Sequence, residues 1–177
     1  MDELNNIFLV GPMGSGKTTI GRQLAKVLER EFVDSDHEIS RRTGADIPWI
    51  FDIEGEAGFR ERERAVIDDL TQRQGIVLAT GGGAVLDASN RQYLASRGTT
   101  VYLSASIDQL HMRTAKDRNR PLLQTDDPRA QIEALMEIRD PLYREVADIV
   151  VDTDDRSVRA TVQYVIDEIS QQTSSEM

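Results

Sequence analysis

Residues 7–19, "IFLVGPMGSGKTT", decide the fold of this 177-residue chain. Four apolar residues precede the pattern G-x-x-x-x-G-K-[ST], which runs from Gly11 to Thr18. In such a loop the glycines let successive backbone N–H groups point at phosphate oxygens, and the following helix presents its N-terminus to the same anion. Lys17 can then reach the β- and γ-phosphates, and the Thr18 hydroxyl can ligate Mg²⁺. A strand is expected before the pattern and a helix after it, so we predict a nucleoside triphosphate site rather than a chance glycine turn.

Short apolar runs alternate with helical periodicity along the rest of the chain. The runs expected to be strands are 7–10, a brief one within 31–36, 75–80, 99–104 and 148–153. They are nearly continuous, which is typical of parallel strands covered on both faces. The sequence therefore predicts an α/β protein with the three-layer α/β/α P-loop kinase fold and a five-stranded parallel sheet. We expect one domain over 1–177, with 170–177 as a disordered tail.

The composition limits the classes of partner. Hydrophobic residues make up 39% and charged residues 29%, with a net charge of −10, so we expect a soluble globular protein without a nucleic-acid-binding surface. No apolar run approaches the roughly 20 residues that span a bilayer, and the acidic start "MDELNN" is unlike a secretory signal. The absence of cysteine excludes disulfides and cysteine-bound metal, and it fits a cytoplasmic protein.

An acidic pair follows the second expected strand, in "FVDSDHE" (32–38). If the strand geometry continues, Asp34 and Asp36 face the same way at the edge where open α/β sheets build their sites. Two like charges aimed at one crevice repel each other unless a cation or a hydroxyl lies between them. One carboxylate would help to hold Mg²⁺ and the other would accept a proton from a substrate hydroxyl. A solvated acidic turn or a helix cap is the alternative.

Three consecutive glycines, Gly81–Gly83, follow the third expected strand in "ATGGGAV" (79–85). Such a run favours close approach of the backbone to a ligand, although a merely flexible loop would also allow it. This strand ends in Thr80, where the second P-loop motif usually has an aspartate. A protein carboxylate for Mg²⁺ must therefore come from elsewhere, and Asp34 is the candidate.

Two arginines belong to expected helices that carry apolar stripes. Arg60 precedes Glu63 by three residues on a helix expected after residues 54–58, and this spacing lets Glu63 hold the guanidinium. Arg139 continues the stripe formed by Ile132, Leu135 and Met136. A buried arginine needs an anion, which is either an internal carboxylate or, as we favour, a ligand carboxylate bound bidentately. Pro141 is expected to end this helix near Arg139.

The irregular stretch "RNRPLLQTDDPR" (118–129) carries Arg118 and Arg120. A cationic loop that folds over a γ-phosphate would neutralise developing charge and exclude water, which competes with the intended acceptor. A solvated basic loop is the alternative.

Together these motifs resemble the shikimate kinase family over nearly the whole chain. The similar stretches are "NIFLVGPMGSGKTTIGRQLA" (6–25), "DSD" (34–36), "GFRERE" (58–63), "IVLATGGG" (76–83), "RPLL" (120–123) and "RDPLYREVAD" (139–148). The resemblance implies Mg²⁺-dependent transfer of the γ-phosphoryl group of ATP to the 3-hydroxyl of shikimate, giving shikimate 3-phosphate and ADP, and we expect a monomer.

The resemblance also implies residue roles. Asp36 would bind the substrate hydroxyls and act as the base, and Arg60 and Arg139 would bind the shikimate carboxylate. The substrate would also contact the glycine run, Gly81, Gly82 and Gly83. Thr18 and Asp34 would serve Mg²⁺, and Lys17 and Arg120 would steady the transferring phosphate. The nucleotide would contact Gly14, Ser15, Gly16, Lys17, Thr18, Thr19, Arg113 and Arg120, with the substrate segment at about 34–65 and a lid at about 113–126.

Two rivals remain open at the level of sequence. Gluconate is also a carboxylate with several hydroxyls, so the arginines do not exclude a gluconate kinase. A nucleotide-gated binding protein would lack Lys17, Asp36 or the lid arginine, and all three are present. Trp49 and Phe51 are candidates for either core packing or substrate contact.

Overall fold

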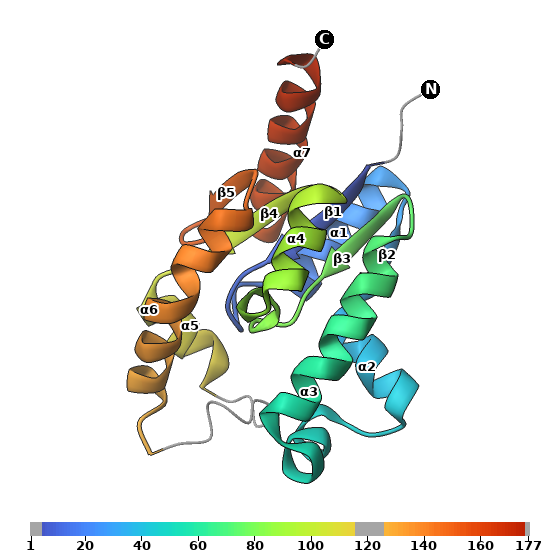
Figure 1. Ribbon diagram of the computed structural model, residues 1–177. Helices are drawn as coiled ribbons and strands as arrows, with labels where there is room; N and C mark the ends of the chain where they lie inside the picture. The colour runs from blue at the N-terminus through green and yellow to red at the C-terminus, as the bar shows by residue number, and fades with distance from the viewer. Residues whose placement is uncertain (1–4, 116–125, 176–177) are drawn as a thin grey trace.

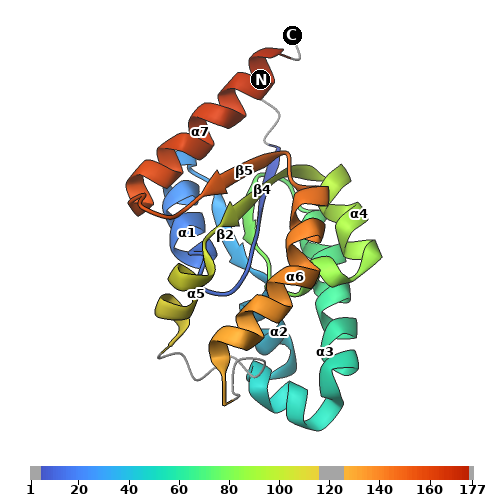
Figure 2. The same cartoon turned by 90° about the vertical axis from the view of Figure 1, so that its left-hand side faces the viewer.

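The computed structural model describes residues 5–115 and 126–175. In this part of the chain one sheet contains five strands in the order β2-β3-β1-β4-β5, and every neighbouring pair is parallel. The strands are β1 Asn6–Val10, β2 Glu31–Asp34, β3 Ile76–Ala79, β4 Gly98–Ser104 and β5 Ile149–Asp152. The predicted α/β fold with a five-stranded parallel sheet is confirmed, and the helices cover both faces (Figures 1 and 2).

Two apolar cores, one on each face of the sheet, hold the helical layers. The helices are α1 Lys17–Leu28, α2 Ser35–Thr43, α3 Ile47–Thr71, α4 Ala88–Ser96, α5 Ile107–Thr114, α6 Pro128–Val146 and α7 Val158–Ser175, with a 3₁₀ turn η1 at Ala84–Leu86. One core joins Phe8 and Val10 of β1 to α3, α4 and α6, while the other joins Ile7 and Leu9 to α1 and α7. Because β1 is buried on both faces, its apolar run is continuous rather than alternating.

The second strand ends earlier than the sequence interpretation assumed. β2 stops at Asp34 and α2 begins at the next residue, with Asp34 as its cap: the carboxylate accepts a hydrogen bond from the His37 N–H at 3.1 Å. Asp36 therefore lies in the first turn of α2, and the expectation that both carboxylates share one strand face is wrong. Aspartate is a strong N-cap residue, so the chain begins a helix after Asp34 instead of continuing the four-residue edge strand.

Two helices continue beyond their expected ends. α6 passes through Pro141 to Val146, because the buried side chains of Tyr143 and Val146 hold its last turns against the core. α7 continues to Ser175, so most of the tail expected to be disordered is helical. The Gln172 amide donates to the Asp148 carbonyl at 3.2 Å, which attaches this last part of the helix to the start of β5.

Helix α3 is bent at Gly55, whose dihedral angles are φ 73° and ψ 176°. Residues with a side chain rarely take this conformation, so glycine is required at the bend. The bend separates a segment that carries Ile47 and Phe51 from a longer one that carries Arg60 and Glu63. The first segment was missed in the sequence, where we expected the helix only after residues 54–58.

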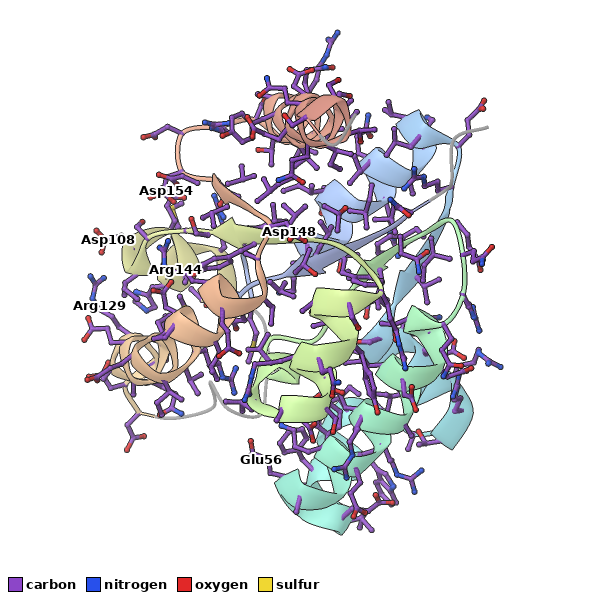
Figure 3. All side chains as sticks on the ribbon, turned by 45° about the horizontal axis from the view of Figure 1, so that its top comes forward. Glu56, Asp108, Arg129, Arg144, Asp148 and Asp154 are labelled. Atoms are coloured by element: carbon purple, nitrogen blue, oxygen red, sulfur yellow. The ribbon has the colours of Figure 1, made fainter. Side chains whose placement is uncertain are left out.

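The helices on either side of residues 116–125 are joined by an ion pair. Arg129 at the start of α6 lies 2.5 Å from Asp108 of α5, and both side chains are labelled in Figure 3. Within 5–115 and 126–175, every helix is too short or too polar to cross a membrane.

Candidate active site

The glycine loop connects β1 to α1 and lines a cavity of about 170 Å³. The Lys17 ammonium group donates to the carbonyls of Gly11 and Pro12, at 2.6 and 2.8 Å. The walls of this cavity, which we call the phosphate cavity, are Met13, Gly14, Gly16, Lys17, Thr18, Thr19, Asp34, Asp36, Thr80, Gly81 and Gly82. A cation and a helix N-terminus therefore meet in one cavity, which is the arrangement that binds phosphate. Of the six predicted loop contacts, Ser15 alone is absent from this wall, because its side chain is buried.

Two oxygen-bearing side chains, those of Thr18 and Asp34, meet at the edge of the phosphate cavity. The Thr18 hydroxyl donates to one oxygen of Asp34 at 3.1 Å, and the other oxygen of Asp34 caps α2. A hydroxyl and a single carboxylate suit Mg²⁺, which takes oxygen ligands and keeps several waters and substrate phosphates. The described residues contain no cluster of three or more acidic or histidine side chains that would hold a metal alone. These residues therefore fit a Mg²⁺ ion that arrives with the nucleotide.

Arg113, the predicted adenine contact, lies beside the glycine loop. Its guanidinium donates to the Gly14 carbonyl at 3.1 Å and to the Thr153 hydroxyl at 3.3 Å. The flat group is thus held between the phosphate loop and the residues that follow β5. Of the predicted lid, residues 116–125 lie outside the described residues, and Arg118 and Arg120 are among them.

A second cavity of about 40 Å³, the acceptor cavity, adjoins the phosphate cavity. Its walls are Met13, Asp36, Ile47, Phe51, Phe59, Arg60, Glu63, Gly81, Gly82, Gly83 and Arg139. The two cavities share four of these residues: Met13, Asp36, Gly81 and Gly82. The structure thus brings Asp36, Arg60, Arg139 and the glycine run together, and it places Asp36 on the boundary between the two cavities.

Four charged residues of this wall, Asp36, Arg60, Glu63 and Arg139, form what we call the acceptor cluster. The Arg60 guanidinium lies 2.9 Å from Glu63, as the spacing predicted, and 3.2 Å from the more exposed Glu56. Glu63 is 0% exposed and Arg139 is 3% exposed. Burial raises the pKa of Glu63 to about 7, and the Asp36 charge adds to this effect against the opposing influence of Arg60 and Arg139. Among residues 5–115 and 126–175, one oxygen of Glu63 has no hydrogen-bond partner.

The glycine run lies against these charged side chains. A Cβ atom on Gly81 would lie 2.7 Å from Asp36 Oδ1 and 2.9 Å from Glu63 Oε2, and one on Gly83 would overlap the Arg60 guanidinium. The Gly81 N–H donates to the Ser35 hydroxyl at 3.0 Å, and the Thr80 hydroxyl donates to the Leu9 carbonyl at 3.0 Å. Within the described residues the glycine run therefore lies close to the protein's own side chains, and its close approach to a ligand stays a prediction.

Apart from Phe51, which was a candidate for substrate contact, sequence reasoning missed the apolar part of the acceptor cavity. Phe51 and Phe59 pack with ring centroids 4.7 Å apart from opposite sides of the Gly55 bend, and Ile47 and Met13 complete the wall. Phe51 lines the cavity, whereas Trp49 is 59% exposed and belongs to neither described cavity. Ser35 and Tyr143 were also missed, because their contacts to the glycine run join residues far apart in sequence.

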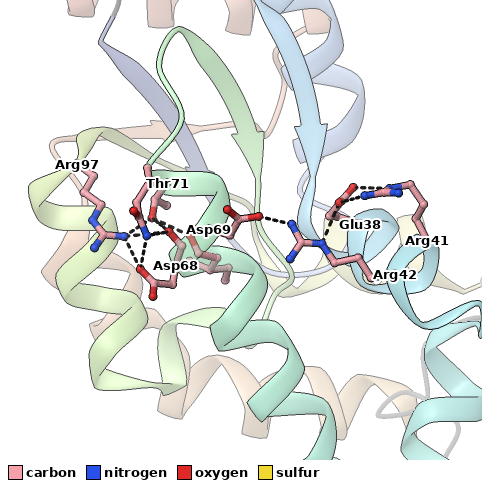
Figure 4. A network of polar contacts seen from close by, with 9 residues as sticks. Glu38, Arg41, Arg42, Asp68, Asp69, Thr71 and Arg97 are labelled. Carbon is pink, nitrogen blue, oxygen red and sulfur yellow. Dashed lines mark hydrogen bonds and ion pairs between the residues drawn. The ribbon is translucent and has the colours of Figure 1, made fainter.

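A separate group on α2 and α3, the ion-pair cluster, consists of Glu38, Arg41, Arg42 and Asp69 (Figure 4). Glu38 Oε1 lies 2.5 Å from Arg41 and 3.0 Å from Arg42, and Arg42 also pairs with Asp69. The hydrogen bond from Arg41 is the main reason that the pKa of Glu38 falls to about 2. This cluster attaches α2, which carries Asp36, to α3, which carries Arg60 and Glu63.

A phosphate cavity with a lysine, a hydroxyl and a carboxylate, joined to a pocket with two arginines and further carboxylates, is the arrangement expected of a P-loop kinase of a small anionic acceptor. The sequence profile of the shikimate kinase family matches residues 13–170. The chain belongs to the shikimate kinase family.

Similar proteins agree with this assignment. A shikimate kinase of Shewanella frigidimarina (strain NCIMB 400) is 58% identical over 96% of this chain and 99% of its own. The structure of shikimate kinase from Acinetobacter baumannii in complex with shikimate is 53% identical, with a TM-score of 0.93 over 95% of this chain and 94% of that one. A gluconokinase from Sinorhizobium meliloti 1021, at 17% identity and a TM-score of 0.60 over 99% and 97% of the chains, shares the fold alone. Because it belongs to the shikimate kinase family, the protein is an ATP-dependent kinase.

Proposed function

We propose that this chain transfers the γ-phosphoryl group of ATP to the 3-hydroxyl of shikimate, releasing shikimate 3-phosphate and ADP. Its identity of 58% to a shikimate kinase over nearly the full length supports this reaction, and so does its likeness to a structure with bound shikimate. The observation that carries the proposal is the position of Asp36, the one carboxylate in the walls of both described cavities.

The acceptor cavity matches the chemistry of this substrate. Arg60 and Arg139 bind the carboxylate of shikimate, since a guanidinium offers two parallel donors to a planar anion. The glycine run lets the ring approach the backbone closely, and Gly81, Gly82 and Gly83 contact the substrate. The aromatic pair Phe51 and Phe59 covers the apolar ring face.

The phosphate cavity holds the nucleotide. Gly14, Ser15, Gly16, Thr18 and Thr19 bind the phosphates through the loop and the start of α1, and Arg113 lies against the adenine. Lys17 and Arg120 stabilise the transferring phosphoryl group by their charge. Thr18 and Asp34 hold Mg²⁺, which when bound would neutralise negative charge on the phosphates.

Asp36 accepts the proton of the 3-hydroxyl as that oxygen attacks the γ-phosphorus. Its place between the cavities lets it orient the hydroxyl toward the phosphate, so positioning and charge supply most of the rate. Closure of the predicted lid at about 113–126 and of the segment at about 34–65 would exclude competing water.

The test is ADP release from MgATP with shikimate, with gluconate and with no acceptor. The proposal expects turnover with shikimate alone, and about a 10³-fold loss of kcat in Asp36→Asn with nucleotide affinity retained. Tight MgATP binding without any phosphorylated shikimate would overturn it, and turnover of gluconate would favour the rival acceptor. An active Asp36→Asn variant would contradict the role of Asp36 as the base.

We also propose that the enzyme works as a cytoplasmic monomer without nucleic-acid or membrane partners. The net charge of −10 disfavours binding to the phosphate backbones of nucleic acids. Light scattering during size-exclusion chromatography, at working concentration and with both substrates, measures the oligomeric state.

A further inference from the structure

Tyr143 is a fully buried residue behind the acceptor cavity. It lies on α6 four residues after Arg139, which places both side chains on the same face of the helix. Its hydroxyl donates a hydrogen bond of 2.5 Å to the carbonyl oxygen of Gly82. Tyr143 and Arg139 also line a small apolar cavity of about 20 Å³, next to Pro12 and Met13 of the glycine loop.

This hydrogen bond fixes the direction of one peptide group in the glycine run. In a planar trans peptide the C=O of one residue and the N–H of the next point in opposite directions. With its oxygen held toward α6, the Gly82 carbonyl turns the Gly83 N–H away from Tyr143. Neither Gly82 nor Gly83 has a side chain to hold this peptide, so the Tyr143 hydroxyl supplies a restraint that the run itself lacks.

The surroundings of Tyr143 keep the hydroxyl available as a donor. Burial raises the pKa of Tyr143 well above its ordinary value, so the group stays protonated throughout the neutral range. The positive charges of Arg139 and Arg60 oppose this shift, which shows that the phenol lies within the field of the acceptor cluster.

We propose that Tyr143 is a positioning residue for the acceptor: it holds the Gly82 peptide and the neighbouring Arg139 in the geometry that receives the acceptor's carboxylate. Tyr143 does not line the acceptor cavity, so it acts through these two neighbours. This role rests on the proposed function, because the carboxylate belongs to shikimate.

The chain contains a matched control in Tyr102. The two tyrosine rings pack with centroids 4.9 Å apart, and Tyr102 is 1% exposed. The Tyr102 hydroxyl donates to Asp140 at 2.7 Å, and no described contact joins it to the glycine run. Replacing either tyrosine by phenylalanine removes one buried hydroxyl from the same aromatic pair, and only Tyr143→Phe releases Gly82.

The experiment measures kcat and both KM values for the wild type, Tyr143→Phe and Tyr102→Phe, well below their melting temperatures. We expect Tyr143→Phe to raise the KM for shikimate about tenfold, with kcat and the KM for ATP within about twofold, because binding geometry is lost while the reacting groups remain. Tyr102→Phe should lower the melting temperature and leave both KM values within about twofold. A merely structural role would move thermal stability without this selective change in KM.

Three outcomes would overturn the inference. An unchanged KM for shikimate in Tyr143→Phe would do so, and so would equal increases in both variants. A wild type that does not phosphorylate shikimate would overturn the proposed function, and this inference with it. The activity of the wild type therefore distinguishes failure of the proposed function from failure of this inference alone. If Tyr143→Phe does not fold, Tyr143→Met supplies a second variant without a hydroxyl, since methionine fills irregular apolar space.

Discussion

Glu38 and Glu63 are both buried carboxylates on adjacent helices beside arginine, yet their pKa values move in opposite directions. Glu38 accepts hydrogen bonds from Arg41 and Arg42, and its pKa falls to about 2. Glu63 is more deeply buried, pairs with Arg60 through one oxygen, and lies near the Asp36 charge, so its pKa rises to about 7. Glutamate thus occurs in two settings. In the ion-pair cluster both oxygens of Glu38 have arginine partners, whereas in the acceptor cluster the described residues give only one oxygen of Glu63 a partner.

The difference shows how the charges are divided between folding and binding. The ion-pair cluster joins α2 to α3 and leaves Glu38 with both oxygens hydrogen bonded. In the acceptor cluster one oxygen of Glu63 lacks a partner in the part of the chain that the structure describes, and Arg139 is buried in the wall of the cavity. Perturbed carboxylates in a cavity are typical of functional sites. Four substitutions test this division, the first through substrate binding and the other three through stability, from the largest expected effect on stability to the smallest.

Arg139→Lys keeps the charge of the acceptor cluster but loses the planar pair of donors. We expect the KM for shikimate to rise about 100-fold, which is about 2.7 kcal/mol, while the KM for ATP stays nearly unchanged. Arg42→Lys in the ion-pair cluster is the control and should leave both KM values within about twofold. Equal increases in the two KM values of Arg139→Lys would contradict a carboxylate role.

Glu63→Gln tests the raised pKa through stability. Because the folded carboxyl holds its proton more tightly than the unfolded one, the wild type loses stability as the pH rises from the ordinary value of 4.5 through about 7. Relative to the variant, this loss should approach about 3 kcal/mol, at about 1.4 kcal/mol per pKa unit. Urea unfolding of both proteins at about pH 4.5 and about pH 8 measures it, and parallel pH profiles would contradict the raised pKa.

Glu38→Gln should show the opposite pH dependence. The lowered pKa of Glu38 stabilises the fold above 4.5, and this contribution disappears as the pH falls through that value toward about 2. In urea unfolding at about pH 6 and about pH 3, the difference in stability between wild type and variant should therefore be smaller at the lower pH. The effect should be smaller than that of Glu63 and should weaken with salt, because Arg41 is 65% exposed.

Arg41→Ala should have the smallest effect. Its side chain is largely exposed, and Arg42 still pairs with Glu38 when Arg41 is removed. We expect the free energy of unfolding to fall only slightly, with kinetic constants unchanged. A selective increase in the KM for shikimate would contradict the separation of the two clusters.

Local patterns were sufficient for much of the fold and of the site. The continuous apolar run before "GPMGSGKTT" predicts a strand buried on both faces, and β1 is such a strand. The three-residue spacing of Arg60 and Glu63 predicts their ion pair because both lie on one helical face. These predictions succeeded because the interacting residues are close in sequence.

Other parts of the fold and of the site could not be predicted, either because two elements compete for the same residues or because the contacts join residues far apart in sequence. Asp34 could continue a strand or cap a helix, and the pattern alone did not decide between them. Pro141 usually ends a helix, but the burial of Tyr143 and Val146 keeps α6 intact. The contact between Tyr143 and Gly82 spans 61 residues, and no local pattern predicts it.

The bend at Gly55 makes the acceptor pocket modular. One short stretch of chain, 47–54, supplies Ile47 and Phe51 to the lining, and another, 56–71, supplies Phe59 and the paired charges, with a single glycine joining them. A Cβ at Gly55 would meet no atom within 4 Å, so the constraint on this residue comes from its backbone angles rather than from crowding. Residues 47–54 could therefore be exchanged for another segment of equal length in order to change the shape of the pocket. Gly55 and residues 56–71, with Arg60 and Glu63, would stay as they are.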